Sequence, residues 1–219
     1  MKKLYIVSFI ILTSTSLVFF SCNDNVIGTK DMTIQISGSL ISHAYITDFY
    51  RNTNFVNDND FAAVAWISGT TGYIGRTLFK FNLSSIPSNA TIKKAEFNLS
   101  YNDTPFHYSG PGHHQDSGSN ASYFQRITQY WLDSIVTWGN QPTVTTNGQI
   151  ILDSSISNYQ NYKVDMTSAI DDMVKNPASN FGFLFRLKYE SPLRVLGFSF
   201  GKSNQNIRPI LNVTYSIPN

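Results

Sequence analysis

Alternation of apolar and polar residues recurs along most of this chain. Within 91–101, the apolar residues from Ala95 to Tyr101 occupy every second position, and polar residues fill the positions between them. Successive side chains of a β-strand point to opposite faces, so this pattern predicts a strand with one buried face. The same reasoning predicts further strands at 43–49, 61–67, 79–83, 121–127, 160–166, 181–187, 196–200 and 211–215.

One segment has helical spacing instead. Ile170, Met173 and Val174 would share one face of a helix. Thr167 or Ser168 could cap its start, and a proline at position 177 would end it. The chain is therefore expected to be all-β: a jelly-roll-like, two-sheet antiparallel β-sandwich with one short helix.

The composition agrees with strands joined by turns. The 219 residues include 16 Phe, 12 Tyr and 14 acidic residues, of which only Glu96 and Glu190 are glutamates. Aspartate favours turns and caps, whereas glutamate favours helix interiors. The net charge of +2 excludes a nucleic-acid-binding protein that relies on bulk positive charge.

The N-terminus resembles an export signal. Two lysines precede an apolar run over 4–20, and the only cysteine of the chain, Cys22, follows directly after Ser21. We predict a lipoprotein signal peptide at 1–21, a lipidated tether at 22–31 and one β-sandwich domain at 32–219. Lipidation of Cys22 would anchor the exported protein to the bacterial cell envelope, at the outer membrane or cell surface. The alternatives are an uncleaved anchor, or a plain signal peptide followed by a chance cysteine.

Six short motifs then occur in a recognisable order: 77–83 (TLFKFNL), 86–95 (IPSNATIKKA), 134–142 (SIVTWGNQP), 164–167 (VDMT), 180–183 (NFGF) and 207–215 (IRPILNVTY). Together they resemble the DNRLRE-type domain, which overlaps carbohydrate-binding module family 96. The resemblance implies a jelly-roll-like sandwich of secreted or surface-attached bacterial proteins, some of which bind alginate-like acidic glycans.

A non-catalytic, surface-anchored module that binds a polysaccharide is the leading hypothesis. An acidic glycan would require cations, and the candidates are Arg76, Lys80, Lys163, Arg186 and Lys188. The alternative is a structural or adhesive module of the envelope or matrix that binds a protein partner.

The long segment 102–120 is the most unusual part of the chain, because loops of this length are often functional or disordered. His107 and Tyr108, together with Phe106, could stack on a pyranose ring there. The histidines at 107, 113 and 114 could instead bind a transition metal, although their spacing matches no structural zinc site.

A calcium site is a further hypothesis. Asn57, Asp58 and Asp60 offer side-chain oxygens, which calcium prefers, and a polar turn is the alternative interpretation.

Catalysis is not expected from the sequence. The motif Gly197–Gly201 has the G-x-S-x-G form but alternates as a strand would, and nothing in the sequence brings Glu96 and Glu190 together. Trp138 is expected to lie in the core rather than to serve as a sugar platform.

Overall fold

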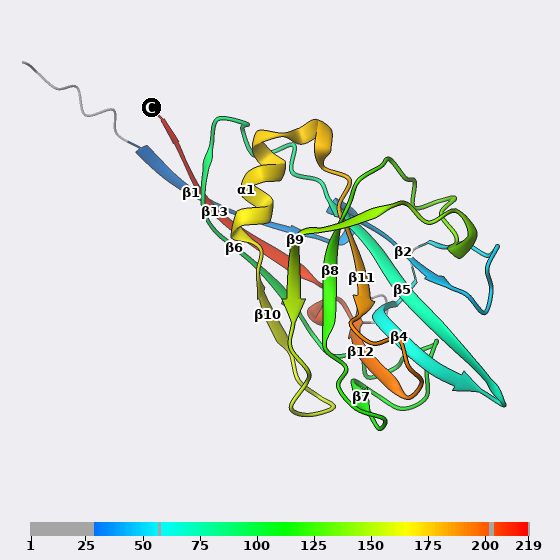
Figure 1. Ribbon diagram of the computed structural model, residues 1–219. Helices are drawn as coiled ribbons and strands as arrows, with labels where there is room; N and C mark the ends of the chain where they lie inside the picture. The colour runs from blue at the N-terminus through cyan, green and yellow to red at the C-terminus, as the bar shows by residue number, and fades with distance from the viewer. Residues whose placement is uncertain (1–28, 57, 202–203, 219) are drawn as a thin grey trace, which may run out of the picture.

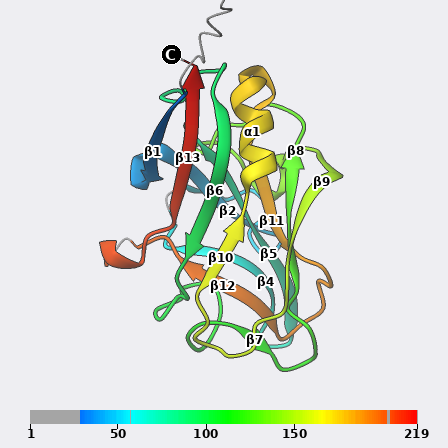
Figure 2. The same cartoon turned by 90° about the vertical axis from the view of Figure 1, so that its left-hand side faces the viewer.

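The computed structural model describes residues 29–56, 58–201 and 204–218, which form two antiparallel sheets packed face to face (Figure 1). The smaller sheet has the order β1 (Thr29–Ser37), β13 (Ile210–Pro218), β6 (Thr91–Leu99) and β10 (Tyr162–Asp165). Figure 2 views the molecule from the side of this sheet.

The larger sheet contains nine strands. Its main path runs through β7 (His114–Gln115), β12 (Arg194–Ser199), β4 (Asp60–Ser68), β5 (Thr71–Phe81), β11 (Phe183–Leu187), β8 (Ser122–Ile127) and β9 (Val144–Leu152). Off this path, β2 (Ile41–Thr47) pairs with both β5 and the short β3 (Phe55–Val56).

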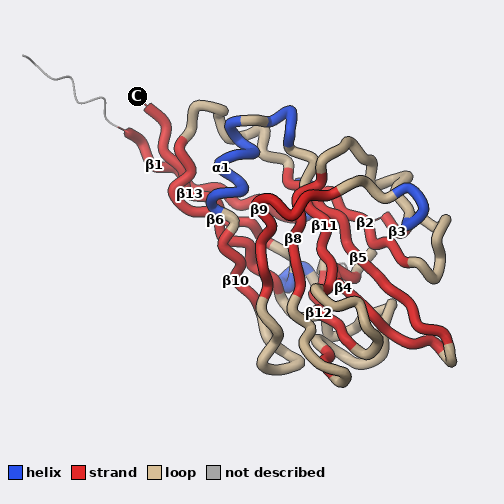
Figure 3. Tube along the Cα trace, viewed as in Figure 1, coloured by secondary structure: helices blue, strands red, loops and turns tan. Residues whose placement is uncertain are grey.

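Helical segments are short (Figure 3). The α-helix α1 (Thr167–Lys175) packs against β6, and four 3₁₀ turns complete the set: η1 (Gly38–Leu40), η2 (Trp138–Asn140), η3 (Pro177–Ser179) and η4 (Gln205–Ile207). No helix within the described residues is both long and apolar enough to cross a membrane.

The predicted all-β sandwich with one short helix is confirmed, with differences in individual elements. β9 was not predicted, because it is an edge strand in which only Leu152 is buried, so it lacks a buried alternating face. β5 begins at Thr71 rather than at position 79, since its first half forms a hairpin with β4 and contains two glycines, Gly72 and Gly75, that interrupt the alternation. β1 begins at Thr29, three residues before the predicted domain boundary at Met32.

The start of α1 also differs from the prediction. Met166 occupies the N-cap position and makes no side-chain capping bond, so neither Thr167 nor Ser168 caps the helix. The Thr167 hydroxyl instead donates to Asp165 Oδ1 at 2.6 Å, and the backbone N–H of Ala95 donates to the same hydroxyl at 3.0 Å. These bonds join the beginning of the helix to β6.

Phenylalanine rings fill the space between the sheets. Phe79 of β5 is fully buried, and its ring centroid lies between 4.9 and 5.6 Å from those of five others: Phe61, Phe81, Phe97, Phe124 and Phe183. Phe97 belongs to the smaller sheet, so the Phe79 cluster joins the two layers. Edge-to-face and offset-stacked rings add to the free energy gained by burial.

Replacing this central ring should destabilise the fold. We expect Phe79→Ala to lower the free energy of unfolding by about 3–5 kcal/mol, because it leaves a cavity between the sheets. Phe106→Ala removes a ring that is 79% exposed and should change the value by no more than about 0.5 kcal/mol. Urea denaturation measures both, and equal losses would contradict this description of the core.

Candidate functional site

An open cleft lined by aromatic side chains lies beside the hairpin that joins β4 to β5. It has a volume of about 320 Å³. Its lining comes from the end of β2 and the following turn, the two hairpin strands and the loop after β6: Thr47, Phe49, Tyr50, Trp66, Ile67, Ser68, Tyr73, Phe106, His107, Tyr108 and Ser109. We call it the aromatic cleft.

Three rings of the aromatic cleft are open to solvent. Phe106 is 79% exposed, Tyr50 is 52% exposed and Phe49 is 41% exposed. Phe49 lies edge-on to Tyr50 and also contacts Tyr73, with centroid distances of 4.8 and 5.5 Å. The aromatic cleft therefore offers a ring surface that the fold itself leaves uncovered.

His107 and Tyr108 support this surface from below. Both side chains are nearly buried, and the His107 ring stacks on Tyr45 at a centroid distance of 4.0 Å. The Tyr73 hydroxyl donates to the His107 carbonyl. Tyr108 packs into the cluster around Tyr45 and Val64. Of the three loop residues expected to contact a ligand, only Phe106 presents its ring to solvent.

A buried carboxylate holds this part of the loop in place. Asp60, at the start of β4, is fully buried and accepts hydrogen bonds from the backbone N–H groups of Phe106 and His107 at 3.0 and 2.8 Å. Asn102 Nδ2 donates to the same carboxylate at 2.6 Å. Burial raises the pKa of Asp60, whereas the bonds from the loop backbone act in the opposite direction.

A second anchor lies farther along the loop, at His113. Its Nδ1 accepts from the N–H of Gly197 at 3.1 Å, and its Nε2 donates to the Gln160 carbonyl at 2.8 Å. Gly197 also lies directly against the Tyr108 hydroxyl, which a Cβ at that position would overlap. The segment 102–120 is therefore folded onto β12 and contains the short strand β7.

A comparison with known protein families identifies the family of this sandwich. The model of carbohydrate-binding module family 96 matches residues 36–215. The chain belongs to this family. A search of curated proteins finds no match.

Membership of this family suggests a non-catalytic module that binds a carbohydrate. The G-x-S-x-G motif of this family 96 module lies mainly in β12, as predicted. Ser199 is buried there, and its hydroxyl accepts from the N–H of Gly201 at 3.0 Å. A nucleophile elbow would instead expose its serine between a strand and a helix.

Two of the predicted ligand-binding cations lie together and share one acid. Arg76 forms a two-pronged ion pair with Glu190 at 2.8 Å, and Arg186 Nη2 lies 2.9 Å from the same carboxylate. The Arg76 guanidinium also lies 4.5 Å from the centre of the Trp138 ring, which is half-buried rather than part of an open platform. Burial lowers the pKa of Arg186, while Glu190 opposes that effect.

Of the two predicted lysines outside this ion pair, Lys188 follows Arg186 closely in the chain, whereas Lys163 lies on the other sheet. Lys188 lies near Glu190 in sequence, with Nζ 5.5 Å from the Tyr189 ring centre. Lys163 belongs to β10 of the smaller sheet and lies 3.7 Å from Glu96. We call Arg76, Arg186 and Lys188, with Glu190, the basic patch; it has two more cations than acids.

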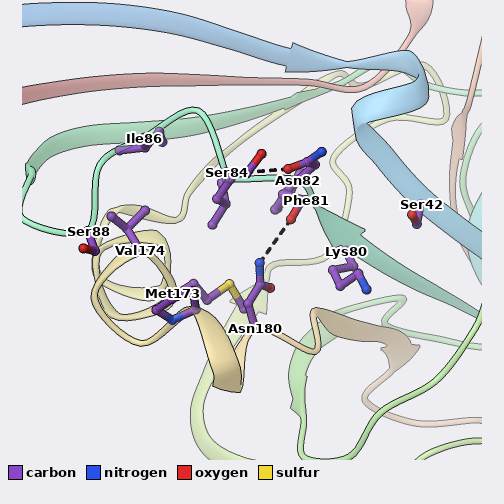
Figure 4. Close-up of a pocket in the computed structure, with 12 residues that line it drawn as sticks. Ser42, Lys80, Phe81, Asn82, Ser84, Ile86, Ser88, Met173, Val174 and Asn180 are labelled. Atoms are coloured by element: carbon purple, nitrogen blue, oxygen red, sulfur yellow. Dashed lines mark hydrogen bonds between the residues drawn. The ribbon is translucent and has the colours of Figure 1, made fainter.

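Lys80 lines a different cleft, of about 560 Å³, between the end of β5 and α1 (Figure 4). In Figure 4, Lys80 and Ser42 lie toward one end of this cleft and Val174 of α1 toward the other, with Asn180 and Met173 next to each other between them. No ion pair of Lys80 is found among the described residues. The predicted cations therefore lie in three regions, and none of them lines the aromatic cleft.

The candidate metal residues form a different group from the expected one. Asn57 lies outside the described residues. Asp58 and Asp60 lie near His107, and one ligand atom from each of the three is within 4.8 Å of the others. His107 Nε2 is 2.9 Å from Asp58 Oδ2, and Asp60 is already bonded to backbone N–H groups. Calcium prefers a cage of oxygens, which these three side chains do not form, so the calcium site stays a prediction.

Sequence reasoning missed most of the aromatic cleft. Phe49 and Trp66 come from segments that were predicted only as strands, and no predicted element included Tyr50 or Tyr73. Two adjacent aromatic residues followed by Arg-Asn-Thr-Asn in a turn were a usable signal, because a large ring in a polar turn is not needed for strand packing.

The His113 anchor generates a pH prediction. Burial lowers the pKa of His113 to about 4, and its Nδ1 must stay unprotonated to accept from Gly197. Because the folded pKa lies below that of the unfolded chain, stability is fully present above about pH 6.5 and declines toward pH 4, by about 3 kcal/mol in total. His113→Gln should remove this part of the pH dependence.

Denaturation curves between pH 7 and pH 4 measure how the free energy of unfolding depends on pH in the natural protein and in His113→Gln. His114→Gln is the matched control, since His114 is only partly buried. An identical loss of stability in the natural protein and His113→Gln would contradict the assignment.

Proposed function

We propose that this protein is a surface-anchored module that binds a polysaccharide in the aromatic cleft without cleaving it. The observation that carries the proposal is the group of three solvent-exposed rings, Phe49, Tyr50 and Phe106, on a floor of packed side chains. Aromatic faces are partly negative and attract the C–H groups of a pyranose ring, while the hydroxyls of that ring stay in water. Family membership supports a saccharide as the ligand.

The order of the floor favours binding as well. Asp60 and the contacts of His107 hold the loop backbone before any ligand arrives. A preorganised site loses less conformational entropy on binding than a mobile loop would. Little additional conformational entropy is therefore lost when the Phe106 ring contacts a ligand.

Anchoring through Cys22 would suit this arrangement. Cys22 lies outside the described residues, so the support comes from the sequence and from the position of β1. In Figure 1, β1 begins at the upper left, whereas the β4–β5 hairpin beside the aromatic cleft points to the lower right. A lipid attached upstream of β1 would leave the aromatic cleft facing away from the membrane.

An acidic, alginate-like polysaccharide is a second candidate ligand, and the basic patch favours it. The patch contains three cations, Arg76, Arg186 and Lys188, and one acid, Glu190, so its net charge is +2. A chain of uronates could pair with the parts of Arg186 and Lys188 that remain accessible to water. This mode would not use the aromatic cleft.

Removal of the exposed rings should weaken polysaccharide binding. We expect Tyr50→Ala and Phe106→Ala each to lower the affinity by about tenfold or more, a loss of about 1.4 kcal/mol. Tyr130→Ala is the matched control, because Tyr130 is 65% exposed but does not line the aromatic cleft. Calorimetry against a panel of soluble glycans, with an assay for new reducing ends, measures both binding and cleavage.

Unchanged affinity in both cleft variants would contradict the assignment of the site. If no glycan of the panel bound, the hypothesis of a module with a protein partner would take its place. New reducing ends that depend on the purified protein would contradict binding without cleavage.

The anchor has a separate test. We expect Cys22→Ser to abolish incorporation of labelled palmitate and to release the protein from the membrane fraction, because the sulfur is the proposed acceptor of the lipid. Labelled palmitate in the Cys22→Ser protein, or continued membrane association without lipid, would contradict this part of the proposal.

A further inference from the structure

We infer that the aromatic cleft selects uncharged polysaccharide chains and rejects polyuronates. The inference rests on the proposed function, since it names the ligand class of the same site. It depends on three features: the absence of lysine and arginine from the described lining, the carboxylates directly behind the lining, and the electron-rich faces of the exposed rings.

The described lining of the aromatic cleft contains no lysine or arginine. Arg51 follows Tyr50 directly but lies outside the lining, in an exposed turn. The cations of the basic patch and Lys80 belong to other surfaces. A carboxylate on a bound sugar would therefore find no lysine or arginine among the residues that line the aromatic cleft, and the histidine there, His107, is nearly buried and already contacts Asp58.

Negative charge lies one hydrogen bond behind the lining. Asp60 contacts the backbone of Phe106 and His107, and Asp58 Oδ2 is 2.9 Å from His107 Nε2. The contacts of Asp60 are all N–H donors, a pattern that suits an ionised carboxylate rather than a protonated one. A third acid, Asp48, accepts from the N–H of Ile74 at 2.7 Å next to Tyr73.

The effect of this charge extends to the cleft wall. Burial raises the pKa of Tyr73 to about 12, and the negative charge of Asp60 contributes to the rise. A uronate carboxylate placed against the same wall would experience the same repulsion, strengthened by the partly non-polar surroundings.

The exposed rings add to this preference. The face of an aromatic ring carries partial negative charge, which attracts C–H groups and cations and repels anions. A neutral pyranose offers C–H groups to Phe49, Tyr50 and Phe106, whereas a uronate adds an anion at C6 of each unit. The neutral chain therefore fits both the ring surface and the charge behind it.

Matched pairs of oligosaccharides test the inference. β-1,4-Mannohexaose and β-1,4-mannuronate hexamer share a backbone and differ only at C6, as do cellohexaose and the β-1,4-glucuronate hexamer. Calorimetry at low salt should show at least one neutral chain binding at least tenfold more tightly than its uronate partner. Phe106→Ala should weaken that binding, while thermal unfolding confirms that the variant stays folded.

Asp58→Asn provides an independent readout of the charge effect. This substitution removes one negative charge behind the lining at nearly constant size. It should narrow the ratio between neutral and acidic affinities by several-fold, because the uronate chain gains affinity relative to its neutral partner when the charge is removed. Added salt should narrow the ratio in the natural protein as well, because it screens the repulsion.

The outcomes separate this inference from the proposed function. A uronate that binds as tightly as its neutral partner, and that Phe106→Ala weakens, overturns the inference but leaves the aromatic cleft as the site. If no chain shows binding that depends on Phe106, both fail. Uronate binding that is lost in Arg186→Ala/Lys188→Ala but not in Phe106→Ala, alongside neutral binding in the aromatic cleft, supports the inference.

Discussion

The buried carboxylate of Asp60 joins the large sheet to the loop that presents Phe106 in the aromatic cleft, the proposed polysaccharide site. Asp60 lies at the first position of β4. Its oxygens accept hydrogen bonds from N–H groups of a loop that lies 42 or more residues farther along the chain. Burying a charge is costly unless it is well bonded, so the loop and the carboxylate require each other. The positions of Phe106, His107 and Tyr108 follow from this contact.

Aromatic residues divide between two tasks. Phenylalanines joined through Phe79 fill the space between the sheets and provide the apolar burial that holds the sandwich together. A second group, around Tyr45 and Trp66, covers the outer side of the large sheet and forms the floor of the aromatic cleft. The same residue class therefore stabilises the fold and leaves a ring surface open to solvent.

Charged side chains also gather on different surfaces of the molecule. The carboxylate of Glu190 offsets part of the positive charge of Arg76 and Arg186. On the smaller sheet, Lys163 lies 3.7 Å from Glu96. The acids Asp58 and Asp60 lie under the aromatic cleft instead. The small net charge of +2 therefore includes a basic patch with excess cations and an aromatic cleft with anions behind it.

Local patterns in the sequence determined the sandwich, the helix at α1 and the family, because alternation and helical spacing are set by near neighbours. Individual cations and loop residues could also be named as candidates. Which of them meet was decided only by tertiary structure. Pairing of distant strands brings Arg76 to Glu190, and loop packing brings His107 to Asp58. The aromatic cleft combines three segments far apart in sequence, and no periodicity within one segment reports on such contacts.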